Sequence, residues 1–445
     1  MAAIVLFRDD LRVDDNPAFI KALESDLVIP IFVYEPEFYG SANKVYLYNA
    51  LNSLDEKLFG KLNYFHGSEG ELFDFIKSLQ ESYSIDSVFW NRRYHNRQIE
   101  KDKALKKKLT ESGFECESFK GTLFKEPWQI KKSDGSCFKV FTPFFKAWLQ
   151  SSINDDFKPE KAEFSSDQIK KICGNLDELN LLPKNKWHEK FSFNYSIDGA
   201  IECFESFLNR IDSYKDKRDF PSINATSGLS PYFRFGQISL KTIFNSLNFQ
   251  DNNHLKFISE IAWREFAYHV FFHFPYIESE NYNASFNQFP WVDNDFFLKS
   301  WQKGEVGIPM VDAGMKELWQ TGTMHNRVRM ITASFLIKNL LIDWRKGKAW
   351  FDDCLFDADF AVNSFSWQWV AGSGFDAAPY FRVFNPILQG KKFDSQAVYI
   401  KKFLPELEKL EAKDIFSDEV TGYIRPIVSL SESRKEALSA WESIR

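Results

Sequence analysis

The residues best suited to unusual chemistry lie within one stretch, 322–386. Its first part, GTMHNRVRMITASFL, places Asn326 and Met330 four apart on one face of an expected helix, with Arg329 beside them. Its second part adds two carboxylates, an amide and two indoles, namely Asp357, Asp359, Asn363, Trp367 and Trp369. Charged and amide groups beside indoles suit a large planar group with polar edges better than hydrolysis or metal chemistry. The alternative is a helical core with ion pairs.

Arg329 needs a partner if it points inward, because an unpaired buried charge is costly. Asp357 is the expected partner. We therefore predict an Arg329–Asp357 ion pair at the centre of any binding site in this stretch.

Two upstream segments also offer binding groups. Thr226, Ser227 and Ser230 precede an expected helix, where hydroxyls and free N–H groups can hold phosphate. The alternative for them is simple helix capping. In SEIAWREF, Glu260, Trp263 and Arg264 share one helix face and could line a cavity wall, or form no more than a local ion pair.

The periodicity that must position these groups changes along the chain. IVLF at 4–7 and LVIPIFVY at 27–34 are typical of buried strands, and helical stretches alternate with strands to about residue 130. From about 206 the pattern is helical throughout. The sequence predicts a parallel α/β domain (1–130), an interdomain connection over the surface (131–205) and an all-α domain (206–445).

Composition narrows the class of protein further. Charged residues make up 27% and hydrophobic residues 44% of the 445 residues, as in globular proteins. No apolar run suits a membrane span and no signal peptide precedes MAAIVLF, so we expect a cytoplasmic protein. The five cysteines form no CxxC pair, which favours neither a disulfide framework nor a metal site. A net charge of -6 leaves room for nucleic-acid binding only through a local basic patch.

Four strings carry a resemblance: FRDDLRVDDNPA near the N-terminus, MHNRVRMITASFL, WQW and DAAPYFRVFNP. Together they resemble the photolyase/cryptochrome family, in particular the bacterial-type, class I-like photolyases that repair cyclobutane pyrimidine dimers. The resemblance implies a Rossmann-like antenna-binding domain followed by a helical FAD-binding domain. It further implies a monomer that splits dimers in damaged DNA with light and reduced FAD (FADH⁻).

The resemblance also assigns roles to individual residues. Those matching the FAD site are Tyr214, Thr226, Ser227, Ser230, Arg264, Arg329, Asp357, Asp359 and Asn363, with the Asn363 amide against flavin N5. Those matching the lesion side of the pocket are Glu260, Trp263, Asn326, Met330 and Trp369. Glu260 would need to be protonated to donate to a thymine carbonyl, which burial would favour.

Two further groups follow from the same resemblance. Trp367, Trp344 and Trp301 match an electron relay from flavin to surface, with Trp301 outermost. Arg218, Arg327, Arg382, Lys391 and Lys392 would contact DNA around the cavity into which the dimer is flipped.

The second pigment is a separate question. Arg97 and Gln98 stand where relatives use Asn-Glu to hold folate, so we predict another pigment or an empty antenna site; folate, deazaflavin, flavin and none all stay open.

Two functional alternatives also remain: a cryptochrome-like photosensor, and repair of the (6-4) photoproduct. The latter would need a histidine pair, whereas MHN supplies only His325. AGSGFDA (371–377) matches GxGxxA but lies in a helical region, so we do not expect a dinucleotide fingerprint there.

Overall fold

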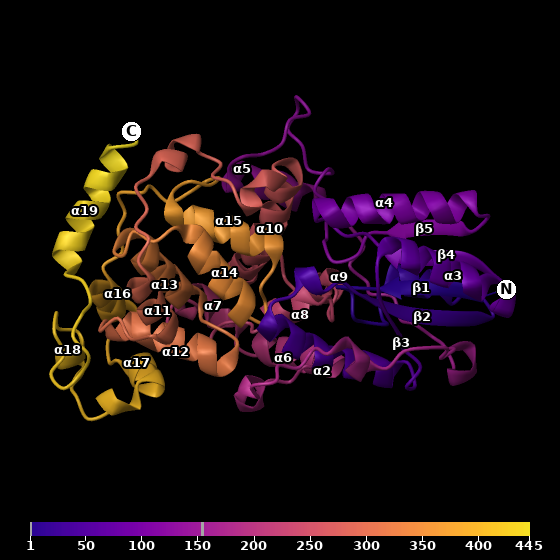
Figure 1. The fold of residues 1–445 in the computed structure, drawn as a ribbon, viewed down its shortest axis with the longest axis horizontal. Helices are drawn as coiled ribbons and strands as arrows, with labels where there is room; N and C mark the ends of the chain where they lie inside the picture. Colours follow the sequence, from indigo (N-terminus) through magenta and orange to yellow (C-terminus); the bar gives the residue numbers. More distant parts are fainter. Residues whose placement is uncertain (1, 153–154) are drawn as a thin grey trace.

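The chain folds into a sheet-containing part and a larger helical part (Figure 1). The structure is a computed structural model that describes residues 2–152 and 155–445. Its sheet has five parallel strands in the order β3-β2-β1-β4-β5. The strands are β1 (Ala2–Phe7), β2 (Leu27–Tyr34), β3 (Asn63–His66), β4 (Ile85–Asn91) and β5 (Glu115–Phe119). The predicted α/β class is confirmed.

The apolar runs of β1 and β2 form strands because helices and loops cover both faces of the sheet. β1 is buried along its whole length, as expected for a central parallel strand. The helices that alternate with the strands are α1 (Pro17–Ala22), α2 (Ser41–Lys57), α3 (Glu69–Tyr83) and α4 (Asn96–Glu111). Asn16 caps α1 and a Ser68–Glu71 capping box begins α3.

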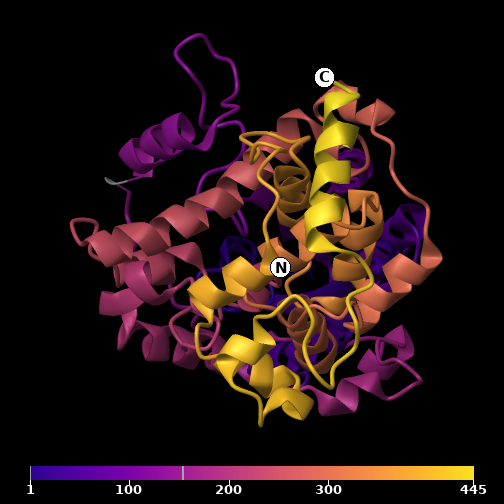
Figure 2. The same ribbon diagram turned by 90° about the vertical axis from the view of Figure 1, so that its left-hand side faces the viewer.

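The rest of the chain is helical. It comprises α5 (Phe141–Ser152), α6 (Ile197–Leu208), α7 (Tyr214–Lys217), α8 (Ser230–Arg234), α9 (Leu240–Asn245), α10 (Asn252–His273), α11 (Asp295–Lys303), α12 (Pro309–Thr321), α13 (Asn326–Lys338), α14 (Trp344–Cys354), α15 (Phe360–Ala371), α16 (Pro386–Phe393), α17 (Val398–Phe403), α18 (Ala412–Ile415) and α19 (Leu430–Glu442). In Figure 2 α19 lies in front, at the end of the molecule away from the sheet. Across residues 2–152 and 155–445 no helix is long and apolar enough to cross a membrane.

The connection between the two parts is more integrated than we expected. α5 packs on α10, where Trp148 Nε1 donates to Glu265 Oε2 at 3.2 Å. Further along, Lys170 N donates to Val28 O at 2.9 Å beside β2. The predicted surface connection is therefore partly a helix of the all-α part and partly an extension of the sheet side. α6 begins at Ile197, inside the predicted connection (131–205).

Hydrogen bonds join the two parts at the start of α2. Ser41 N and Oγ both donate to Asp353 Oδ1, at 2.9 and 2.6 Å. Asn43 Nδ2 donates to the carbonyls of Leu355 and Phe356 at 3.0 and 2.8 Å. The segment after α14, which contains the predicted Asp357, is thus held by the α/β domain.

A buried histidine ties α10 to the chain leading out of the sheet. His269 Nε2 accepts from Phe138 N at 3.0 Å, and its Nδ1 lies 2.8 Å from Pro127 O. This pattern uses the neutral ring, and burial lowers the pKa of His269 to about 4. The unfolded chain takes up the proton near pH 6.5, so folding stability falls as the pH drops from there towards 4.

We therefore expect His269→Gln, compared with the wild type by thermal unfolding across pH 4–8, to flatten this loss. For each pH unit within that window, the free energy of unfolding of the wild type should fall by up to about 1.4 kcal/mol more than that of the variant. Identical pH profiles of the melting temperature would contradict the role of His269.

Candidate functional site

Four neighbouring residues of α10 form a partly exposed stripe. The second half of this helix is otherwise largely buried. The stripe contains Ser259, Glu260, Trp263 and Arg264, whose neighbours Ile258, Ile261 and Ala262 are buried. Such a stripe marks a helix face that the protein itself leaves partly open. It is the face predicted to line the cavity.

Glu260 on this stripe is surrounded by positive charge. It forms ion pairs with Arg218, at the end of α7, and with Lys256 at 2.7 Å. Both cations lie against Glu260 Oε1. The side chain is 27% exposed and ion-paired, whereas the expectation of a donating Glu260 assumed burial in an aromatic pocket.

Trp263 and Arg264 face different neighbours. The Trp263 ring stacks on Phe141 with 3.7 Å between ring centres, and it also meets Phe365 of α15 at 6.0 Å. The Arg264 guanidinium lies over the Tyr268 ring at 4.9 Å and donates to the Thr122 carbonyl at 3.2 Å. Trp263 thus joins α10 to α15, whereas Arg264 is directed to the junction with the α/β domain.

The predicted ion pair between α13 and the following loop forms. Arg329 Nη2 donates to Asp357 Oδ2 at 3.0 Å, and Arg329 Nε donates to Met324 O at 2.7 Å. The other carboxylate oxygen, Asp357 Oδ1, is buried and has no hydrogen-bond partner within the described chain. A buried, unsatisfied acceptor is costly unless a ligand satisfies it.

Both carboxylate oxygens of Asp359 accept hydrogen bonds from other residues of the chain. Its Oδ1 caps α15 by accepting from Ala361 N and Val362 N, at 2.9 and 3.0 Å, and its Oδ2 accepts from the Tyr268 hydroxyl. Any contact from Asp359 to a ligand would therefore come mainly from its backbone. Between the two aspartates, Arg234 Nε donates to Ala358 O at 2.8 Å.

The residues predicted to hold phosphate lie at the start of α8. Thr226 and Ser227 are partly exposed, Ser230 is exposed, and Ser227 Oγ accepts from Leu229 N at 3.3 Å. Tyr214, at the start of α7, is buried against Phe207 and Phe257. The two open hydroxyls, Thr226 and Ser230, retain bonding capacity for an anion.

The lesion-side residues of α13 and α15 are partly open. Asn326 is exposed and its Nδ2 lies 4.0 Å from Met330 Sδ, as their four-residue spacing predicts. Trp369 is half-buried near the end of α15. AGSGFDA forms the end of the same helix, where Gly372 caps it with φ 81°, which explains the glycine without a dinucleotide site.

The three predicted relay tryptophans are all buried. Trp367 presses on α14 at Gly347, one turn after Trp344, and its ring centre lies 6.3 Å from that of Trp301. Trp301 is 0% exposed and donates to Thr332 O at 3.0 Å. The placement of Trp301 at the surface end was therefore wrong, because water does not reach its ring.

We infer that Trp291, rather than Trp301, forms the surface end of the relay. It is partly exposed, and the next residue, Val292, donates to Leu341 O at 2.8 Å, three residues before Trp344. Sequence spacing missed it because nothing in the pattern around FPWVDN distinguishes it from a core tryptophan. We expect Trp291→Phe to reduce flavin photoreduction to a small fraction of wild type, and Trp301→Phe to reduce it less. Absorbance during steady blue illumination measures both, and the reverse order would contradict this assignment.

The predicted DNA-contacting cations fall into two groups. Arg382, Lys391 and Lys392 are exposed. Arg327 is paired to Asp219 at 2.7 Å and lies 4.4 Å over the Phe393 ring, and Arg218 is committed to Glu260. The exposed group is therefore free to meet phosphate, whereas Arg327 and Arg218 are engaged in ion pairs within the protein.

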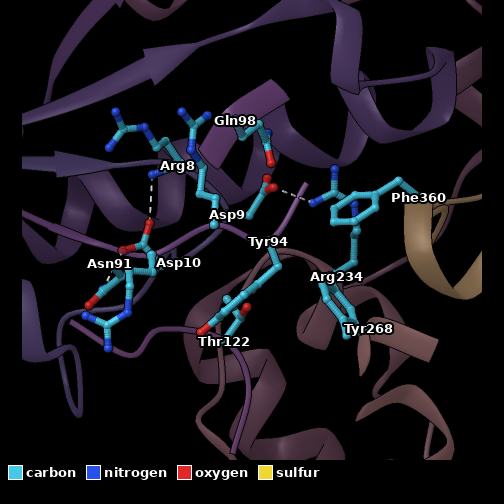
Figure 3. Close-up of a pocket in the computed structure, with 12 residues that line it drawn as sticks. Arg8, Asp9, Asp10, Asn91, Tyr94, Gln98, Thr122, Arg234, Tyr268 and Phe360 are labelled. Carbon is cyan, nitrogen blue, oxygen red and sulfur yellow. Dashed lines mark hydrogen bonds and ion pairs between the residues drawn. The ribbon is translucent and has the colours of Figure 1, made fainter. Parts of the chain in front are cut away.

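A small cavity lies between the carboxyl ends of β1 and β4 and the helical domain (Figure 3). Arg8, Asp10, Asn91 and Gln98 line it, and Arg234 crosses it to pair with Asp9 at 2.8 Å. Its volume of about 20 Å³ suits roughly one water. Outside it, the Arg97 guanidinium lies over the Phe38 ring at 5.3 Å.

The helical domain thus offers several polar groups that suit a large, polar-edged ligand. The unpartnered Asp357 oxygen can accept from an N–H edge, the α8 hydroxyls can meet a phosphate, and the α10 stripe leaves one face open. This donor and acceptor set fits FAD.

Comparison with known proteins agrees with that inference. Residues 3–163 match the family model described as DNA photolyase, and residues 257–443 match the FAD binding domain of DNA photolyase. This chain belongs to the photolyase/cryptochrome family of FAD-binding proteins.

Deoxyribodipyrimidine photo-lyases are among the relatives that this chain is similar to. It is 41% identical to the deoxyribodipyrimidine photo-lyase of Agrobacterium fabrum, over 99% of this chain and 98% of that protein. It is 32% identical to the one from Escherichia coli, over 99% of this chain and 98% of the relative.

Two solved structures are also similar to this chain over nearly its whole length. A bacterial class III photolyase from Agrobacterium tumefaciens has a TM-score of 0.93 at 40% identity, covering 100% of this chain and 97% of the other. A Synechocystis cryptochrome has a TM-score of 0.84 at 25% identity, covering 99% of each chain. The family is as predicted, and the first of these structures is of class III rather than class I-like.

Proposed function

We propose that this protein is a light-dependent DNA repair lyase that splits cyclobutane pyrimidine dimers. The observation that carries the proposal is the Arg329–Asp357 pair with its unsatisfied carboxylate oxygen. FAD, when bound and reduced, would supply the electron that opens the dimer and would take it back once the ring has split, with no net oxidation or reduction.

The chain's own residues would hold the two reactants. Arg329 and Asp357 bind the flavin edge, and Asn363 orients it. On the lesion side, Trp263 and Trp369 stack on the flipped bases, Asn326 and Met330 contact them, and the Glu260 carboxylate accepts from a thymine N–H. Since the carboxylate is held by Arg218 and Lys256, it reaches the dimer already oriented.

DNA would be held mainly through its phosphates. Arg382, Lys391 and Lys392 are exposed cations near the end of the stretch that carries the flavin site. Phosphate contacts give affinity with little sequence preference, as a repair enzyme requires. We further propose that the protein acts as a monomer in the cytoplasm.

Two related functions share this fold and are distinguished by experiment. A photosensor would undergo the same photoreduction but leave dimer-containing DNA unchanged. A (6-4) repair enzyme would act on that lesion instead, and the pocket wall at MHN supplies a single histidine, His325, whose pKa burial lowers to about 4.

The antenna proposal concerns the α/β domain. Arg97 lies over Phe38 and Gln98 is buried at the small cavity, so neither offers the carboxylate that the Asn-Glu arrangement supplies to a folate. We expect protein purified from its native host to release FAD but no stoichiometric folate on denaturation. Chromatography of the released pigments measures both, and one folate per chain would refute the prediction.

A further inference from the structure

The side-chain amide of Asn363 has a fixed orientation. Asn363 Nδ2 donates to Asp352 Oδ1 at 2.6 Å and lies 3.3 Å from the carbonyl oxygen of Lys348, both on α14. A carboxylate and a carbonyl can only accept, so both partners require the NH₂ end of the amide. The amide oxygen Oδ1 must then point away from α14.

Asp352 is itself held in place. Its Oδ2 accepts from Lys348 Nζ at 2.7 Å, one helical turn away. On the other side, the α/β domain approaches so closely that a Cβ on Gly40 would lie 1.9 Å from Asp352 O. The neighbouring Asp353 is bonded to Ser41. The carboxylate that orients Asn363 therefore lies at an end of α14 that the α/β domain holds in place.

We propose that Asp352 is a positioning residue that presents the Asn363 oxygen, rather than its NH₂ group, to flavin N5. The inference rests on the proposed function, which places FAD against Asn363. An oxygen acceptor favours flavin states that carry a proton on N5 and disfavours states in which the N5 lone pair would face it. Asp352 thereby selects the protonated flavin without touching it.

The test compares variants by the visible spectrum of the bound flavin after partial photoreduction, which separates N5-protonated from unprotonated flavin. Asp352→Leu keeps the side chain's bulk and removes the nearer of the two acceptors, leaving only the Lys348 carbonyl at 3.3 Å, so the amide can turn its NH₂ towards N5. We expect the ratio of protonated to unprotonated flavin to fall at least about tenfold, equivalent to roughly one pH unit in the apparent N5 pKa. Asp352→Glu, which retains a carboxylate, should restore much of the ratio.

The matched control is Asp353→Ala, which loosens the same segment at Ser41 but leaves the amide acceptor intact. Its ratio should equal that of wild type. An unchanged ratio in Asp352→Leu, or an equal fall in Asp353→Ala, would overturn the proposal. Should Asp352→Leu fail to fold, Asp352→Asn replaces it: its amide can face Asn363 with either end, so the ratio should fall by a smaller factor, and no fall would overturn the proposal.

Wild-type protein that binds no FAD would instead refute the proposed function. The two failures are therefore distinguishable, because the inference about Asp352 is judged only on protein that has bound FAD.

Discussion

Replacing Asp357 by alanine is expected to release most of the FAD during purification. The change removes the carboxylate that pairs with Arg329 at 3.0 Å and the only unsatisfied buried acceptor in that pair. A hydrogen bond to a charged group contributes about 1.5–3 kcal/mol, so retention should weaken roughly ten- to hundredfold. The ratio of flavin to protein absorbance after gel filtration gives the result.

Two controls separate binding from folding. Asp357→Asn keeps the shape and one acceptor oxygen, so it should retain an intermediate amount of FAD. Asp353→Ala removes the carboxylate bonded to Ser41, four residues earlier in the same segment, and should retain full FAD. Undiminished flavin in Asp357→Ala would show that the pair is misplaced with respect to the ligand.

Replacing Glu260 by alanine is expected to lower repair while leaving FAD content intact. Its carboxylate lies on the open stripe of α10, held by Arg218 and Lys256. Losing a hydrogen bond to a charged group should reduce the yield of repaired dimers per flash by roughly tenfold. Counting cyclobutane dimers in an oligonucleotide after single flashes measures this yield.

Two variants show whether the ion pairs or the lesion contact matter. Lys256→Met removes one of the cations beside Glu260 but leaves its oxygens, so repair should stay close to wild type. Glu260→Gln keeps one acceptor oxygen and should fall between wild type and alanine. Full repair by Glu260→Ala would exclude Glu260 from the lesion site.

Much of the fold could be predicted from the sequence, because the patterns that indicate helices and strands are local. Apolar runs such as LVIPIFVY became β2 as predicted, and the spacing of Asn326 and Met330 placed both on one face of α13. The Arg329–Asp357 pair could also be predicted, since a guanidinium that points inward requires a partner, and Arg329 is partly buried.

What the sequence could not supply was contact between distant segments. Nothing near FDDCLFD indicates that Asp352 faces Asn363, because the two lie on different helices. The burial of Trp301 is likewise set by its neighbours Thr332 and Trp367, so a tryptophan expected at the surface lies in the core. The ion pair between Arg218 and Glu260 was likewise not predictable, because it joins residues that lie far apart in the sequence.

The most direct test of the proposed function is repair by the purified, FAD-loaded and chemically reduced protein. Oligonucleotides with a cyclobutane dimer or a (6-4) photoproduct are illuminated side by side with blue light, with dark samples as controls. We expect loss of the cyclobutane dimer in the light alone and no change in the (6-4) lesion. Repair of only the (6-4) lesion, or of neither lesion by fully reduced protein, would contradict the assignment.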